Sequence, residues 1–241
     1  MFLKVFGICL MSTALFAQEF DARWKVLPKI FKGDNIVQIA KSLDTKKGEF
    51  ESTDAFNARL AKLAPSDRAF FFFCDGIPLG VQYDADAKEF SFSRRSYDVH
   101  LEVAKIENTG KSYYGTNVFG VTKKVKELWN TAYALYDQGW DINAGLVFTL
   151  PCPPDQAPAV KKDLGMAVLA NLVPHAHFGQ KYNDMGNPFM SLSTFYREAT
   201  VSSPLEYMST TYTLVCDVQK VVVFRKSDRS ILLVVAPKKT K

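Results

Sequence analysis

Clusters of like charge, catalytic serine motifs and histidines are all scarce in this sequence of 241 residues. No window holds five or six charges of one sign, and the formal net charge is only +5. A nucleic-acid-binding surface usually needs such a basic cluster, so the sequence predicts no nucleic-acid partner. No Gly-x-Ser-x-Gly elbow is present, and no glycine-rich phosphate loop leads from a strand into a helix with the required lysine. The sequence therefore predicts no cofactor.

Long hydrophobic runs are also missing, except at the N-terminus. Val5–Phe16 is apolar, follows the positive Lys4 and precedes the small residue Ala17. This pattern is typical of a secretory signal peptide, so we expect residues 1–17 to be removed and residues 18–241 to form one exported domain, periplasmic or secreted. The alternative is a buried N-terminal helix. No later segment reaches the roughly 18 apolar residues that a membrane-spanning helix needs, so we expect no transmembrane segment in the mature chain.

Cysteine is infrequent as well. The chain has four, and one of them, Cys9, lies inside the expected signal peptide. In an oxidising compartment two of the remaining three, Cys74, Cys152 and Cys216, can form a disulfide and leave one over. The sequence does not select the pair, and buried free thiols are the alternative.

What the sequence does contain is strand-like patterning. Residues 68–76 include a continuous apolar run, Phe90 and Phe92 alternate with serines, and residues 220–237 are typical of a hairpin. His100 falls on the polar face of another alternating segment. Residues Val121–Tyr136 fit either a helix or strands. The predicted fold class is α+β and β-rich, with a mostly antiparallel sheet or two packed sheets and a few short helices.

Three short helices are expected. Ile36, Ile39, Ala40 and Leu43 have helical spacing. A second helix begins at a Ser52 or Thr53 cap and stops at Pro65. A third follows "PPDQAP", and we expect Gly165 to end it.

Three segments, "KGEFESTDAFNAR", "YYGTNVFGV" and "EATVSSPLEY", resemble a loose group of uncharacterised exported bacterial proteins. The resemblance covers most of the mature chain in patches. It implies a β-rich exported domain and favours strands for Val121–Tyr136. It implies no activity and no site residues.

The stretch "NLVPHAHFGQKYNDMG" holds the candidate metal ligands His175 and His177. Residues i and i+2 of a strand share a face, so both side chains can reach one ion. Zinc sites usually have three or four protein ligands, for which Asp184, Asp155 and His100 are candidates. The alternative is a pair of loop histidines without a metal.

Other candidate sites have structural interpretations that compete with chemistry. Cys152 with a histidine is a candidate thiol dyad, or else a structural thiol between prolines. Asp84 and Asp86 are candidate paired carboxylates, or else turn residues. The aromatic residues of "YYGTNVFG" are candidates to line a ligand groove, or else they belong to the core. No catalytic residue is predicted.

The predicted function is that of an exported, non-enzymatic protein that binds a protein or envelope partner, for example an envelope protein, through a strand edge or an aromatic patch. The alternative is a metal-dependent or other hydrolase that uses the region of His175 and His177. Convergence of these histidines with an acid in one pocket would favour the alternative. A structural piece of an envelope machine, the third class, would carry a large exposed apolar patch.

Overall fold

A computed structural model describes residues 19–77, 79–93, 100–137, 147–175 and 187–237. Strands make up 50% of the structure and helices 14%, which confirms the β-rich prediction. The elements in chain order are α1 (Ile36–Leu43), α2 (Thr53–Leu63), β1 (Ala69–Phe73), β2 (Gly80–Asp84), β3 (Glu89–Ser93), β4 (Leu101–Thr116), β5 (Thr122–Asp137), β6 (Val147–Pro151), α3 (Ala157–Asp163), β7 (Leu164–Leu172), β8 (Met190–Arg197), β9 (Leu205–Arg225) and β10 (Ile231–Val235).

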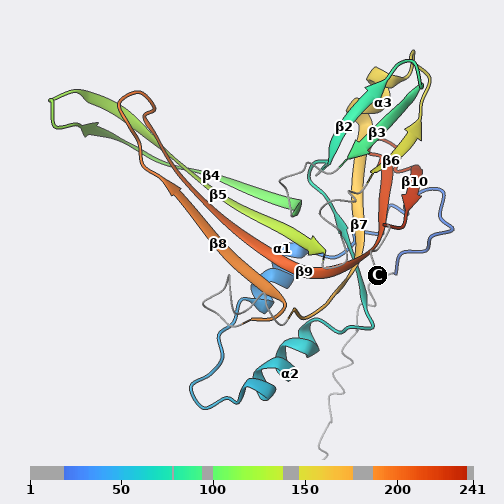
Figure 1. Cartoon of the computed structure of the whole chain (residues 1–241), viewed down its shortest axis with the longest axis horizontal. Coiled ribbons are helices and arrows are strands. Elements are labelled where there is room, and N and C mark those ends of the chain that lie inside the picture. The colour runs from blue at the N-terminus through green and yellow to red at the C-terminus, as the bar shows by residue number, and fades with distance from the viewer. Residues whose placement is uncertain (1–18, 78, 94–99, 138–146, 176–186, 238–241) are drawn as a thin grey trace, which may run out of the picture.

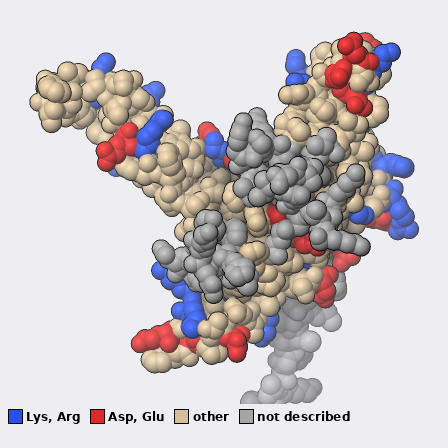
Figure 2. Space-filling view, viewed as in Figure 1, with Lys and Arg blue, Asp and Glu red and all other residues tan. Residues whose placement is uncertain are grey.

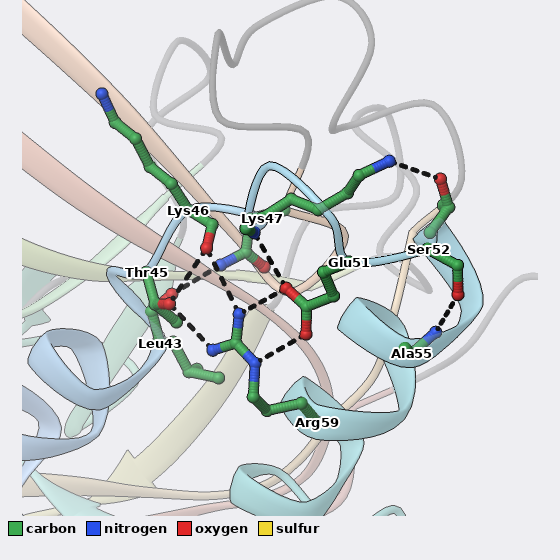
Figure 3. A network of polar contacts seen from close by, with 11 residues as sticks. Leu43, Thr45, Lys46, Lys47, Glu51, Ser52, Ala55 and Arg59 are labelled. Carbon is green, nitrogen blue, oxygen red and sulfur yellow. Dashed lines mark hydrogen bonds and ion pairs between the residues drawn. The ribbon is translucent and has the colours of Figure 1, made fainter.

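The two predicted N-terminal helices form where their caps and apolar spacing place them. Asn35 Oδ1 accepts from the Gln38 N–H at the start of α1, and Ser52 Oγ accepts from the Ala55 N–H at the start of α2. Arg59 of α2 forms a bidentate ion pair with Glu51 in the loop that connects the two helices (Figure 3). Arg59 Nε lies 3.0 Å from Glu51 Oε1, and Arg59 Nη2 lies 2.9 Å from Glu51 Oε2. The guanidinium also donates to Thr45 Oγ1, so one side chain ties the connecting loop to α2.

One long strand, β9, organises the large sheet (Figure 1). This sheet has seven strands, with the order β1-β7-β9-β5-β4 and with β8 and β10 also paired to β9. The Val173 N–H donates to the Val215 carbonyl, and the Val215 N–H donates to the Phe189 carbonyl. Strands β7 and β8 therefore follow one another along the same edge of β9, and β5 and β10 line the other edge.

The large sheet is mixed, which corrects part of the predicted topology. Strands β5 and β9 pair in parallel from Lys126↔Leu205 to Asp137↔Cys216, whereas the other pairs in this sheet are antiparallel. A parallel pair needs a crossover, and here the chain passes through β6, α3, β7 and β8 before it returns. The smaller sheet, β2-β3-β6, is antiparallel throughout.

The second half of β9 lies between two apolar layers. Val221 and Val223 belong to the main core, which also takes in α1, α2, α3 and the small sheet. Val222 and Phe224 face the opposite way, into a smaller core closed by Leu27 and Phe31 of the N-terminal segment. Side chains alternate along a strand, so this half of β9 is buried on both faces.

Other predictions about the elements were partly wrong. Val121–Tyr136 lies mainly in β5, so the helical alternative is excluded. Gly165 does not end α3 but lies in β7, where an added Cβ would stand 2.6 Å from Cζ of Phe224. Strand β8 was missed, because its sequence, "MSLSTFYR", follows a polar segment without a clear strand boundary. None of the helices in the described ranges has the length and apolarity to cross a bilayer.

Candidate binding surface

Four strands extend away from the rest of the molecule as one projecting unit (Figure 1). We call this unit the arm and define it as β4, β5, β8 and residues 205–214 of β9. The β4–β5 hairpin turns at residues 117–121, and the connection from β8 to β9 turns at residues 198–204. Both turns lie at the far end of the arm.

One face of the arm continues the main core outward. At its base, Leu101, Leu135 and Leu214 are buried in the same cluster as residues of α1. The next row holds Tyr133 and Tyr212, whose rings stack with centroids 5.3 Å apart. A row of threonines follows, Thr131, Thr210 and Thr194, and beyond it the register places Trp129 beside Met208, and Met208 beside Tyr196. Because alternate residues share a face, this fourth row lies on the same side as the core.

Beyond the base, large apolar and aromatic side chains on this face are exposed. Exposed fractions are 40% for Ile106, 43% for Tyr113, 46% for Trp129 and 51% for Tyr196. We call these four residues, together with the half-buried Met208, the aromatic face. A contiguous apolar surface of this kind is uncommon on a soluble monomer and usually marks an interaction site.

Glu206 holds two tyrosines of the aromatic face in place. Its carboxylate accepts a hydrogen bond from the Tyr113 hydroxyl at 3.1 Å and a second from the Tyr196 hydroxyl. The hydrogen bond to Glu206 is the main cause that raises the pKa of Tyr196 from 10.0 to about 12, and it raises the pKa of Tyr113 as well. Ordered aromatic side chains lose less conformational entropy when a partner binds.

The opposite face of the arm is polar. The Asn130 amide donates to the Tyr207 hydroxyl at 3.2 Å, and this bond together with one to Ser209 lowers the pKa of Tyr207. Phe195, exposed at 59%, is the large aromatic side chain of β8 on this face. The arm therefore has one apolar face and one polar face.

The two turns at the end of the arm border a groove of about 230 Å³. Tyr113, Val121 and Val125 line it from the first hairpin, and Ala199 and Val201 line it from the second. Two of the segments that carry the resemblance, "YYGTNVFGV" and "EATVSSPLEY", thus meet at the end of the arm. Tyr114 and Phe119 are 74% and 86% exposed, so the interpretation of these aromatics as core residues was wrong.

Of the predicted metal ligands, His175 and His100 lie at the base of the arm, and only part of the predicted site falls in the described ranges. The His175 ring stands 6.4 Å from the Tyr136 ring, and the His100 ring stands 6.0 Å from the same tyrosine. His100 is exposed, as its strand position predicted. His177 and Asp184 lie outside the described residues. Among the residues described, no group of three or more His, Cys, Asp or Glu side chains is placed to hold a metal ion.

The structure has no disulfide among Cys74, Cys152 and Cys216. The Cys74 N–H donates to the Met166 carbonyl, whereas Cys216 lies opposite Leu172, six residues farther along β7. At about 3.3 Å per residue this offset is about 20 Å, whereas disulfide-bonded cysteines have Cα atoms within about 7 Å. The strand register therefore excludes a Cys74–Cys216 disulfide in this fold.

Two other candidates take structural positions. Asp84 Oδ1 accepts from the N–H groups of Asp86 and Ala87, so Asp84 caps the β2–β3 turn. Cys152 is buried at the end of β6 in the small sheet, and its Sγ lies 3.6 Å from the Pro153 carbonyl oxygen. His100 and His175 stand beside Tyr136 at the end of a strand of the other sheet.

Comparison with known proteins gives no match, whether to a family model, to a curated protein or to a solved structure. Functional inference therefore depends on this chain's own residues. The aromatic face was missed from the sequence, because Trp129 and Tyr196 come from strands 67 residues apart in the chain. Exposed Trp, Tyr and Met in alternating strands give the same local pattern as buried ones.

Proposed function

We propose that this protein is exported, non-enzymatic and binds a protein of the cell envelope, with the aromatic face of the arm as the binding surface. The observation that carries the proposal is the exposure of Ile106, Tyr113, Trp129 and Tyr196 on one face of a projecting sheet. Tryptophan, tyrosine and methionine are enriched at the centres of protein interfaces, where they supply most of the binding energy.

The shape of the arm supports a protein as partner. Its face is a broad strip across four paired strands, and the polar groups at its centre already have partners, because Glu206 accepts from Tyr113 and Tyr196. A flat surface of this kind matches a second sheet or a helix better than a small molecule, which binds in a concave pocket. Export is supported by the pattern at residues 1–17. Phe20, which follows the expected cleavage site, packs its ring against Trp24 and Phe71 of the body.

Site-specific photo-crosslinking in the exporting cell tests this proposal. A photoreactive residue at Trp129 should give an adduct with an envelope protein, whereas one at Phe195, which is more exposed but lies on the polar face, should not. With that partner purified, Trp129→Ala should weaken binding by roughly tenfold to a hundredfold, as for a hot-spot residue. Phe195→Ala should change affinity by less than about threefold.

Two outcomes would contradict the proposal. Equal adducts from both faces would remove the special role of the aromatic face. Adducts between two copies of this chain, together with a dimer in sedimentation equilibrium that Trp129→Ala dissociates, would show a self-association surface instead of an envelope partner.

The metal-dependent hydrolase remains the alternative, because His100 and His175 both stand against Tyr136. Elemental analysis of the purified mature protein tests it. One equivalent of zinc that is lost in His175→Ala would favour the enzyme and argue against a purely binding role.

A further inference from the structure

The turn of the β4–β5 hairpin is a rigid, convex tip. Asn117 Oδ1 accepts from the N–H groups of Phe119 and Val121, at 3.0 Å and 2.9 Å. The Asn117 and Gly120 backbones add two further bonds across the turn, and Gly120 has a φ of 79°, which glycine adopts without strain. The turn therefore holds Val118 and Phe119 at its apex.

These two apolar side chains are among the most exposed in the described chain. Val118 is 94% exposed and Phe119 is 86% exposed, and Tyr114 stands behind them at 74%. Exposing a phenylalanine and a valine at the end of a projecting arm is unfavourable in water, and in a water-soluble protein it usually serves an interaction.

Lysines lie behind this apex, and acidic side chains stand farther back, where Glu127 accepts from the Lys111 N–H and Glu206 accepts from the Tyr113 hydroxyl. From Asn108 to Lys126 the sequence contains Lys111, Lys123, Lys124 and Lys126 and no aspartate or glutamate. All four lysines are exposed. Figure 2 shows the uncharged end of the arm with basic side chains set back from it. The end of this hairpin thus carries four positive charges behind an apolar apex.

We propose that the β4–β5 tip docks on the surface of an anionic lipid bilayer, with Val118 and Phe119 inserted and the lysines against the headgroups. Lys124 and Lys126 lie two and four residues behind the pair Thr116–Thr122 that closes the turn. At about 3.3 Å per residue they stand about 7 Å and 13 Å back along the strand. Interfacial segments bury apolar groups about 5–10 Å deep, so the lysines reach headgroup level when the apex is inserted. Tyr114, opposite Lys124, is an aromatic residue of the kind that favours the same level.

A bilayer fits this tip better than a protein does. The apex is convex and offers two large side chains, whereas a stable protein interface buries about 800 Å² on each partner. The exposed lysines nearest the apex, Lys123 and Lys124, are complementary to anionic phosphatidylglycerol headgroups. The tip is separate from the aromatic face, so this inference does not depend on the envelope-protein partner.

Vesicle sedimentation of the full mature protein tests the docking. We expect binding to phosphatidylethanolamine vesicles that contain phosphatidylglycerol, little binding to phosphatidylcholine vesicles, and a marked loss at high salt. Phe119→Ser should lower the partition coefficient by about tenfold or more. The matched control is Phe50→Ser, because Phe50 is 96% exposed but lies in the loop before α2, and this change should have no effect.

Charge and depth are tested separately. Glutamine at Lys123, Lys124 and Lys126 should remove the preference for anionic vesicles, whereas glutamine at the exposed Lys161, Lys162 and Lys226 should not. Tryptophan in place of Phe119 should give added fluorescence that brominated lipids quench.

The proposal is overturned if the parent protein does not bind anionic vesicles, if Phe119→Ser binds like Phe50→Ser, or if neutral vesicles bind equally well. Trp129→Ala should keep vesicle binding, which distinguishes this proposal from the protein-binding role of the aromatic face.

Discussion

The two halves of β9 show how one strand serves two purposes. Residues 205–212 are only half-buried, whereas nine of the twelve residues from Thr213 to Phe224 are buried, all but Asp217, Gln219 and Lys220. The first half lies between β5 and β8 in the arm, and the second lies between β7 and β10 in the body. The small sheet covers the second half, and helix α1 reaches only the base of the arm.

This difference follows the side-chain chemistry of each half. "EYMSTTYT" in the arm is rich in hydroxyl-bearing residues, which tolerate water on the polar face. "VVVF" in the body is apolar at consecutive positions, which suits a strand buried on both faces. The body therefore supplies the stability of the fold, and the arm is left with a surface available for binding.

The largest expected contrast is in core truncation. Phe72→Ala removes a fully buried side chain of the body and should lower the free energy of unfolding by about 3–5 kcal/mol. Phe195→Ala removes a 59% exposed side chain of the arm and should cost about 0.5 kcal/mol or less. Chemical denaturation measures both, and equal losses would break the distinction between body and arm.

A smaller effect is expected where the chain packs closely in the body. Gly165→Ala places a Cβ 2.6 Å from the Phe224 ring, so the free energy of unfolding should fall by about 1–3 kcal/mol. Gly76→Ala is the control, since nothing lies within 4 Å of the added Cβ, and it should leave stability unchanged within about 0.5 kcal/mol. A tolerated Gly165→Ala would mean that β7 and β9 pack more loosely than the structure indicates.

The smallest expected effect concerns the arm and alkaline pH. The raised pKa of Tyr196 means that the folded protein holds this proton more tightly than the unfolded chain. The corresponding stabilisation is present below pH 10 and is lost as the pH rises through about 12. In an ultraviolet titration, Tyr196→Phe should remove one late-ionising tyrosine, whereas loss of a tyrosine that ionises near pH 10 would mean that the Glu206 contact does not persist in solution.

Local patterns predicted the local elements well. Ser52 and Asn35 have side chains that cap the start of a helix. The "KSDRS" turn joins β9 and β10, which are close together in the sequence. Strand β8, the parallel β5–β9 pair and the position of Gly165 were missed, because each depends on which distant segment lies alongside.

For the candidate sites, the sequence pointed to His175 and His177 and named the aromatics of "YYGTNVFG" as a groove candidate, but it could not show that Tyr113 and Tyr196 share Glu206.

The sequence by itself determined the β-rich class, the two N-terminal helices and the apolar leader-like run at Val5–Phe16, because caps, turns and alternation act over a few residues. Only the tertiary structure decided which apolar side chains are covered. Phe72 and Trp129 both lie in strands rich in apolar residues, yet one is fully buried and the other is 46% exposed. The physical reason is that burial depends on what packs against each face of the sheet, and α1 and the small sheet cover the body and the base of the arm but not its outer part.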